Sequence, residues 1–94
     1  SVRQAAAYGL GRLRGHNQNM LRQCLNSLNL ACSDSEWSVR YAAVAALEQR
    51  LQQGLPSDLD QQARSLLQQR SQQEMDDTLV VRLRALLALE RLAA

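Results

Sequence analysis

One block of nine residues occurs three times in this sequence and constrains its fold more than any other feature. Residues 2–10, 39–47 and 81–89 align without gaps, and every copy opens with Val-Arg. A small residue follows each Val by four places, another follows it by seven places, and Leu comes next. The copies begin at Val2, Val39 and Val81. Repeats at such intervals predict stacked structural units, each of which buries its apolar face against its neighbours.

Two amphipathic segments separate the copies of the block. In both segments the apolar side chains follow a three-four spacing, which predicts helices with one face in solvent. The blocks themselves are apolar on nearly all sides, so we expect them to form helices that lie side by side in one layer, with the two segments in a second layer. The apolar stripes of the segments are Leu21, Cys24, Leu25, Leu28 and Cys32, and Leu59, Ala63, Leu66 and Leu67.

Capping residues divide the chain into five helices. The predicted N-caps are Asn17, Asp34, Ser57 and Asp76 or Asp77, and the predicted helix-ending residues are Gly15 and Gly54, the latter followed by Pro56. The expected helices span roughly residues 1–13, 17–32, 35–53, 57–73 and 77–93.

The pattern predicts an all-α fold, an α-α superhelix of about five antiparallel helices. Periods of roughly 40 residues are typical of HEAT and armadillo arrays. We expect a single domain over residues 1–94, made of a half repeat (1–13) and two repeats (17–53 and 57–93). Because the sequence starts at Ser1 without a methionine and enters the pattern directly, we interpret it as a piece of a longer protein. The first and last helices should then expose apolar surface that further repeats cover.

Composition excludes several classes of function. The eleven basic residues are all Arg, nine residues are acidic, and the formal charge of +2 is dispersed, so we expect no nucleic-acid binding. No apolar stretch approaches the roughly 20 residues of a membrane span, and no signal peptide is recognisable. Cys24 and Cys32 are separated by about 12 Å of helical rise and cannot form a disulfide with each other. We therefore expect a cytoplasmic protein.

The residues around the second block carry a resemblance to a known family. An Asp five residues before Val-Arg, followed by the two small residues and Leu, looks like the second helix of a HEAT-like repeat. The stretch Asp34–Val44 with Ala46-Leu47-Glu48, which contains Trp-Ser-Val-Arg-Tyr-Ala-Ala, more specifically resembles the repeats of phycobilin lyases of the E and F type. The third block departs from this pattern, because Leu79 and Leu83 replace Trp37 and Tyr41. Ser35 stands where these repeats often have Pro.

The resemblance implies a role in chromophore attachment. Phycobilin lyases join linear tetrapyrroles to cysteines of phycobiliproteins, commonly as a pair of related subunits. It therefore implies a phycobiliprotein subunit and a second lyase subunit as partners, and a phycobilin as substrate with no intrinsic cofactor. The resemblance also implies that a full lyase is several times longer than one or two repeats. Whether this chain is itself an enzyme therefore stays open.

The sequence offers no catalytic or metal-binding constellation. His16 is the only histidine and falls between the first two predicted helices, so no His-Cys metal cluster can form. Cys24 and Cys32 lie on an apolar stripe, where a thiol packs as a small hydrophobe. The alternative, a nucleophilic or bilin-accepting thiol, requires an exposed and electropositive setting. Asp76-Asp77 is more simply explained by helix capping than by acid-base chemistry.

The Arg of each block stands near a helix N-terminus, where the helix dipole disfavours a cation. In HEAT-like repeats the equivalent Arg and Asp resemble a ladder of ion pairs between adjacent repeats, and charge-assisted pairs of this kind fix the stacking register. We assign the ladder to structure, with ligand binding as the alternative. Its members here, the Asp/Arg ladder, are Arg3, Asp34, Arg40, Asp76 and Arg82.

Trp37 and Tyr41 are four residues apart and share a helix face. They either pack between repeats or form, with Arg40, a contact for a partner or a bilin whose propionates pair with the guanidinium. Two functions follow. The chain is a HEAT-repeat module of a phycobilin lyase or bilin biosynthesis protein, or it is a general protein-interaction scaffold without chromophore chemistry.

Overall fold

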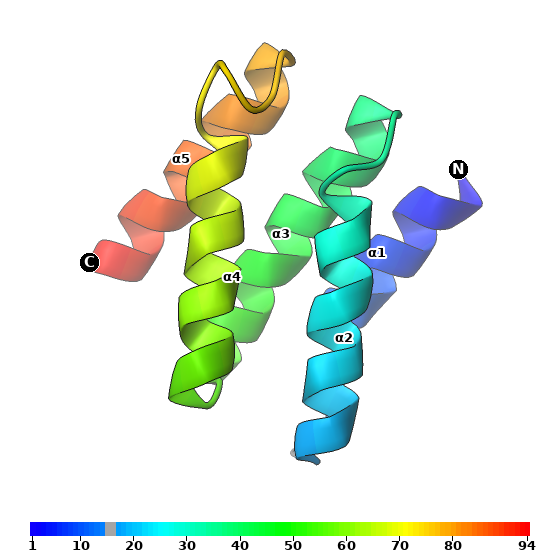
Figure 1. Ribbon diagram of the computed structural model, residues 1–94, viewed down its shortest axis with the longest axis vertical. Helices are drawn as coiled ribbons and strands as arrows, with labels where there is room; N and C mark the ends of the chain where they lie inside the picture. The colour runs from blue at the N-terminus through cyan, green and yellow to red at the C-terminus, as the bar shows by residue number, and fades with distance from the viewer. Residues whose placement is uncertain (15–16) are drawn as a thin grey trace.

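The computed structural model describes residues 1–14 and 17–94, and these residues form five α-helices and no strand (Figure 1). The all-α prediction is therefore confirmed. Gly15 and His16, for which we predicted a helix-ending role and a position between helices, lie outside the described residues. The helices are α1 (Val2–Arg12), α2 (Gln18–Ala31), α3 (Trp37–Gln53), α4 (Ser57–Arg70) and α5 (Leu79–Ala93).

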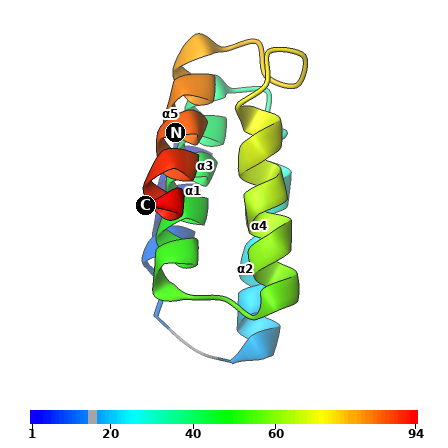
Figure 2. The ribbon, with the colours of Figure 1, turned by 90° about the vertical axis from the view of Figure 1, so that its left-hand side faces the viewer.

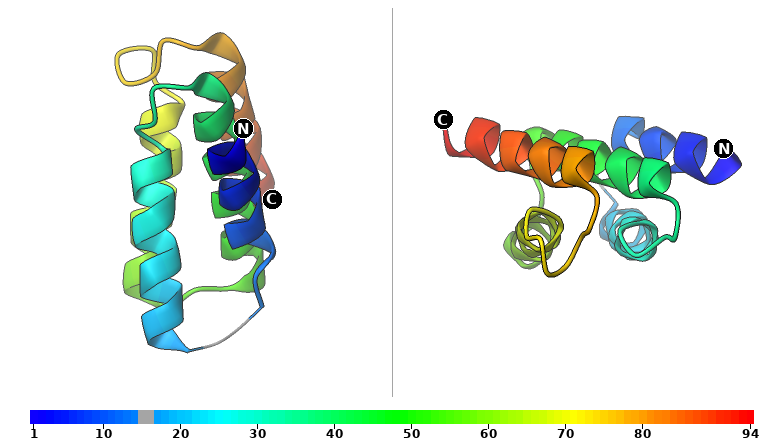
Figure 3. Two further views of the ribbon diagram at one scale, coloured as in Figure 1. Left: turned by 90° about the vertical axis from the view of Figure 1, so that its right-hand side faces the viewer. Right: turned by 90° about the horizontal axis from the view of Figure 1, so that it is seen from above.

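The helices lie in two layers. α1, α3 and α5 form one layer, which we call the inner layer, and α2 and α4 form the other, the outer layer (Figures 2 and 3). The first and last residues lie at opposite ends of the inner layer (Figure 3). This arrangement confirms the layers expected from the hydrophobic pattern. α3 lies between α1 and α5 and also contacts both outer helices, which explains why its block is apolar on nearly all sides.

Two of the predicted caps are confirmed. The Asn17 side chain accepts hydrogen bonds from the N–H groups of Asn19 and Met20, and so satisfies donors that the helix leaves free. Gly54 ends α3 with φ at 97°, a left-handed value that favours glycine.

The predictions for Ser57, Asp34 and Asp76 or Asp77 as N-caps were wrong. Ser57 is already the first residue of α4, and Glu36 and Thr78 hold the N-cap positions of α3 and α5. Asp34 accepts a hydrogen bond from the Glu36 N–H at 2.9 Å, and Asp76 accepts one from the Thr78 N–H at 3.1 Å. Both aspartates therefore close the turn just before the helix, because a short carboxylate readily accepts from the backbone two residues on.

The small residues of the block allow the inner helices to approach closely. Ala46 of α3 is buried against Gly11 of α1, where a Cβ atom on the glycine would lie only 2.7 Å from the Ala46 Cα. Between the layers, Leu residues of α2, α3 and α4 fill the core together with Val81 and Ala85 of α5. None of the helices in the described residues is long and apolar enough to cross a membrane.

Candidate functional site

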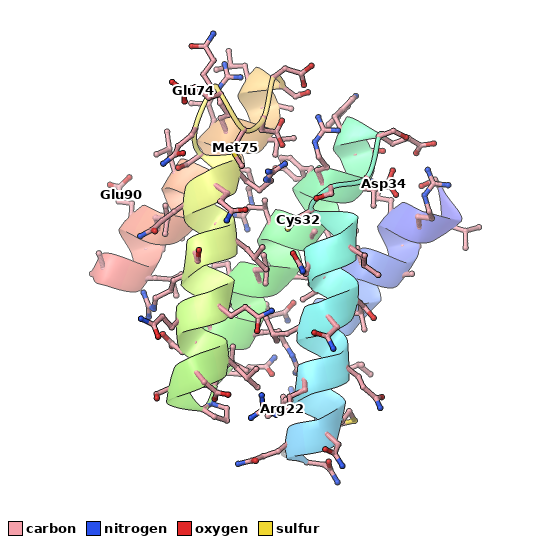
Figure 4. All side chains as sticks on the ribbon, viewed as in Figure 1. Arg22, Cys32, Asp34, Glu74, Met75 and Glu90 are labelled. Carbon is pink, nitrogen blue, oxygen red and sulfur yellow. The ribbon has the colours of Figure 1, made fainter. Side chains whose placement is uncertain are left out.

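Two ion pairs of the Asp/Arg ladder join adjacent repeats. Arg3 of α1 donates from Nε to Asp34 Oδ2 at 2.8 Å and from Nη2 to Asp34 Oδ1 at 3.2 Å. Asp34 belongs to the loop between α2 and α3, and it lies near the start of α1 (Figure 4). Hydrogen bonds from Arg3 and from the Glu36 N–H hold the pKa of the Asp34 carboxyl below its ordinary value. This first pair is largely open to solvent.

The second ion pair is buried. Arg40 of α3 donates from Nε to Asp76 Oδ2 at 2.9 Å and from Nη2 to Asp76 Oδ1 at 3.3 Å. The Asp76 side chain is fully buried in the loop before α5. Arg40 also donates to the hydroxyl of Thr78 at 2.9 Å, and from Nη1 to the backbone carbonyls of Asp34 and Ser35. All five N–H groups of this guanidinium therefore have acceptors within the protein.

Arg70, at the end of α4, adds a second cation to the buried pair. Its Nη1 donates to Asp76 Oδ2 at 3.3 Å and to the Cys32 carbonyl at 2.9 Å. The sequence reasoning missed this residue. No repeat signal could have found it, because α2 ends with the apolar Ala31 at the equivalent position.

The third arginine of the ladder, Arg82 of α5, has no carboxylate partner among the described residues. It donates from Nη1 to the backbone carbonyl of Asp76 at 2.7 Å. Arg40 makes the same contact with the carbonyl of Asp34 in its own repeat. Arg82 thus takes up the same position as Arg40 but lacks the aspartate that a following repeat supplies to Arg40.

The aromatic pair lies at the start of α3. Trp37 is 51% exposed, and Tyr41 is partly buried against the core. Their ring centroids are 6.4 Å apart with the planes at 90°, an edge-to-face contact. The matching positions of α5, Leu79 and Leu83, are also exposed. The inner layer therefore presents apolar side chains at equivalent places on two adjacent helices.

Glu48 is a second interhelical ion-pair site that the sequence reasoning did not single out. It is buried in α3 and lies 2.7 Å from Arg84 Nη1 and 3.6 Å from Arg91 Nη1, both of α5. Gln52 donates to its other oxygen at 3.2 Å. The sequence did contain a signal for this residue, because a Glu follows the Val by nine places in the second and third blocks, as Glu48 and Glu90.

Comparison with known proteins agrees with this geometry. Residues 20–49, which cover α2 and most of α3, match the HEAT repeat family. The chain therefore contains a HEAT-like repeat. It is 39% identical over its whole length to the bilin biosynthesis protein RpcF of Synechococcus sp., and 39% identical to a phycobilisome maturation protein of Synechococcus elongatus. A phycocyanobilin lyase subunit beta of Thermosynechococcus vestitus is 36% identical over 97% of the chain. The resemblance to phycobilin lyases of the E and F type is confirmed.

The chain spans less than half the length of these relatives, namely 46%, 47% and 45% of the three. No solved structure matches it. The similarity therefore applies to less than half of each of these relatives and not to a whole lyase.

The two thiols of the chain are poorly placed for nucleophilic chemistry. Cys24 and Cys32 are both buried, and burial raises the pKa of the Cys32 thiol to about 11. A thiol with such a pKa carries almost no thiolate near neutral pH. In the part of the chain that the structure describes, no cluster of His, Cys, Asp or Glu could hold a metal ion.

Arg40 does not fit the role of a ligand-binding residue that we considered for it. Its guanidinium is buried and fully engaged with Asp76, Thr78 and backbone carbonyls, so pairing with a ligand carboxylate would require breaking those bonds. Trp37, by contrast, has half of its surface free for contact.

Proposed function

We propose that the chain is a HEAT-repeat module of a phycobilin lyase or bilin biosynthesis protein, and that it binds a phycobiliprotein subunit during chromophore attachment. The observation that carries this proposal is the 39% identity that extends over the entire chain to a protein named for bilin biosynthesis. A relative from Nostoc sp. that is 44% identical over 54 residues is named a lyase subunit, which supports a second lyase subunit as a further partner.

The contact surface in this proposal is the exposed apolar part of the inner layer, made of Trp37 and Tyr41 on α3 and Leu79 and Leu83 on α5. Large aromatic side chains that are half exposed combine contact area with few rotatable bonds, and they are typical binding hot spots. The same surface offers a flat ring on which a tetrapyrrole can stack. The bilin is then a substrate held during transfer, not a resident cofactor.

The Asp/Arg ladder has a structural role in this proposal. Arg40 uses all of its donors inside the protein, and Arg3 is paired with the loop of the next repeat. Recognition through the inner layer is therefore mainly apolar, while the ladder fixes the angle between the helices that carry the contact residues.

Titration of the chain with a bilin-free phycobiliprotein subunit tests the proposal. Trp37 is the only tryptophan, so its fluorescence reports on the contact surface directly. Isothermal calorimetry then compares Trp37→Ala with Leu30→Ala, a matched control because Leu30 is an exposed apolar residue of the outer layer. We expect Trp37→Ala to weaken binding by roughly tenfold or more, and Leu30→Ala to leave it unchanged.

Two outcomes contradict the proposal. If both substitutions weakened binding equally, the inner layer would not be the contact surface. No binding of the phycobiliprotein subunit or of free bilin at millimolar concentration would leave the general protein-interaction scaffold as the better description.

A further inference from the structure

Three arginines form ion pairs with the aspartates between repeats, and Arg70 does so with a different part of its guanidinium from the other two. An arginine holds a carboxylate in two-pronged fashion through the N–H groups of Nε and Nη2. Arg3 uses this edge for Asp34, and Arg40 uses it for Asp76. Arg70 contacts Asp76 through Nη1 instead. Its Nε is buried without a partner, and its Nη2 donates to none of the described residues.

The charge around Arg70 is also unbalanced. The side chains of Arg40 and Arg70 are 10% and 9% exposed, and both bind Oδ2 of the fully buried Asp76 carboxylate. Two buried cations that share one buried anion leave an excess of positive charge, which is costly where solvent is excluded. Asp77 offsets it little, because it lies 3.5 Å from Arg40 and its own side chain is 95% exposed. A further carboxylate beside Arg70 would balance the cluster.

Arg70 lines an open cavity of about 420 Å³ between two loops, which we call the loop cavity. One loop joins α2 to α3 (residues 32–36), and the other joins α4 to α5 (residues 71–78) and is longer. The longer loop carries Glu74 and Met75, and the shorter one carries Asp34 (Figure 4). Asp34 is already engaged with Arg3 and with a backbone N–H. The free edge of Arg70 therefore belongs to a side chain in the wall of a cavity that can hold a small ligand.

We propose that the loop cavity binds a carboxylate group through the Nε and Nη2 edge of Arg70. The ligand gives the buried Nε–H an acceptor and completes a cluster of two guanidiniums and two carboxylates. Its carbon chain packs on the half-exposed Met75. The carboxylate comes from a small molecule such as a bilin, or from an acidic side chain of a partner protein. The site itself does not depend on the role of the chain in chromophore attachment.

Titration with sodium propionate tests the proposal, with propionamide as an uncharged control of nearly the same shape. The Arg70 Nε–H resonance is followed by NMR at constant ionic strength. We expect a saturable downfield shift with a dissociation constant of roughly 1–10 mM, as suits so small a ligand, and no such shift with propionamide.

Two lysine variants make the result specific. Arg70→Lys keeps the charge but removes the two-pronged edge, so it should abolish the saturable shifts of backbone amides in the α4–α5 loop. Arg64→Lys changes an exposed arginine of the same helix and should leave propionate binding unchanged. Equal loss of binding in both variants would contradict a site at Arg70.

The source of the carboxylate is identified by repeating the titration with free bilin and with N-acetylglutamate amide. Tighter binding of the bilin would assign the cavity to a small-molecule carboxylate, and tighter binding of the amino-acid derivative would assign it to an acidic side chain. The absence of a saturable Arg70 shift up to about 100 mM propionate would overturn the proposal.

Glu74 provides the remaining test, because it is exposed on the longer loop and is the carboxylate of this chain that could itself reach Arg70. We expect Glu74→Gln to tighten propionate binding by roughly twofold, since it removes a like charge from the rim of the cavity. If Glu74→Gln instead lowered the unfolding midpoint of the free protein as much as Arg70→Lys does, Glu74 would be the partner of Arg70, and the proposal would be wrong.

Discussion

Two glycines of α1 provide a matched test of how closely the inner helices approach. A Cβ atom on Gly11 would lie 2.7 Å from the Ala46 Cα, 2.9 Å from the Ala46 Cβ and 3.0 Å from the Gln49 Oε1. A Cβ atom on Gly9 would meet nothing within 4 Å. Neither glycine has a positive φ, so alanine fits the backbone at both positions. Gly11→Ala and Gly9→Ala therefore differ mainly in the contact across to α3.

The two substitutions should change the free energy of unfolding in opposite directions. Alanine gains up to about 1 kcal/mol over glycine from helix propensity, so Gly9→Ala should stabilise the fold slightly. Gly11→Ala has a comparable gain, but it inserts a methyl group against the backbone of a packed helix, which costs about 1–3 kcal/mol. The two variants should differ by about 2 kcal/mol in unfolding free energy, which corresponds to roughly 10 °C in midpoint for a domain of this size.

Thermal and urea unfolding, followed by far-UV circular dichroism, measure this difference. A double variant adds a second check. Ala46→Gly in the Gly11→Ala background removes the contact with the Ala46 Cβ but leaves the contact with its Cα, so the rescue should be partial. If Gly11→Ala proves as stable as Gly9→Ala, then α1 and α3 are not in the close contact described here, and the reasoning about small residues in the block fails.

Two further predictions concern the ladder. Arg40→Met should destabilise the fold by about 3 kcal/mol in urea unfolding, because it removes a main partner of the buried Asp76 carboxylate. Arg3→Met should cost clearly less, since solvent screens its exposed pair, and equal losses would contradict the difference in burial. The lowered pKa of Asp34 means that its contribution to stability is present above its unfolded pKa and is lost as pH falls through the folded value. Asp34→Asn should therefore flatten the decline of the unfolding midpoint between about pH 5 and about pH 2, and an unchanged decline would contradict this.

The sequence by itself determined the helices and their layers. Apolar spacing is a local property that reflects the helical turn, so it distinguished the inner helices from the outer ones without knowledge of contacts. The repeated Val-Arg and the Asp five residues before it also predicted the ion pairs Arg3–Asp34 and Arg40–Asp76, because the same spacing recurs along the chain. The exact cap positions at Glu36, Pro56 and Thr78 were not determined, since several polar residues near a helix start can satisfy the same donors.

Only the tertiary structure decided which side chains meet across the repeats. Arg40 and Arg82 both follow the Val of their block. Arg40 is covered by the loop of a following repeat and pairs with a carboxylate there, whereas Arg82 bonds to a single backbone carbonyl. Gly9 fits the repeat pattern and Gly11 does not, but Gly11 is the residue that touches α3. These differences depend on the position of helices that lie a whole repeat away in the chain. The distance and rotation between neighbouring inner helices are set by the packing of the whole inner layer. The sequence of a single block does not determine that packing.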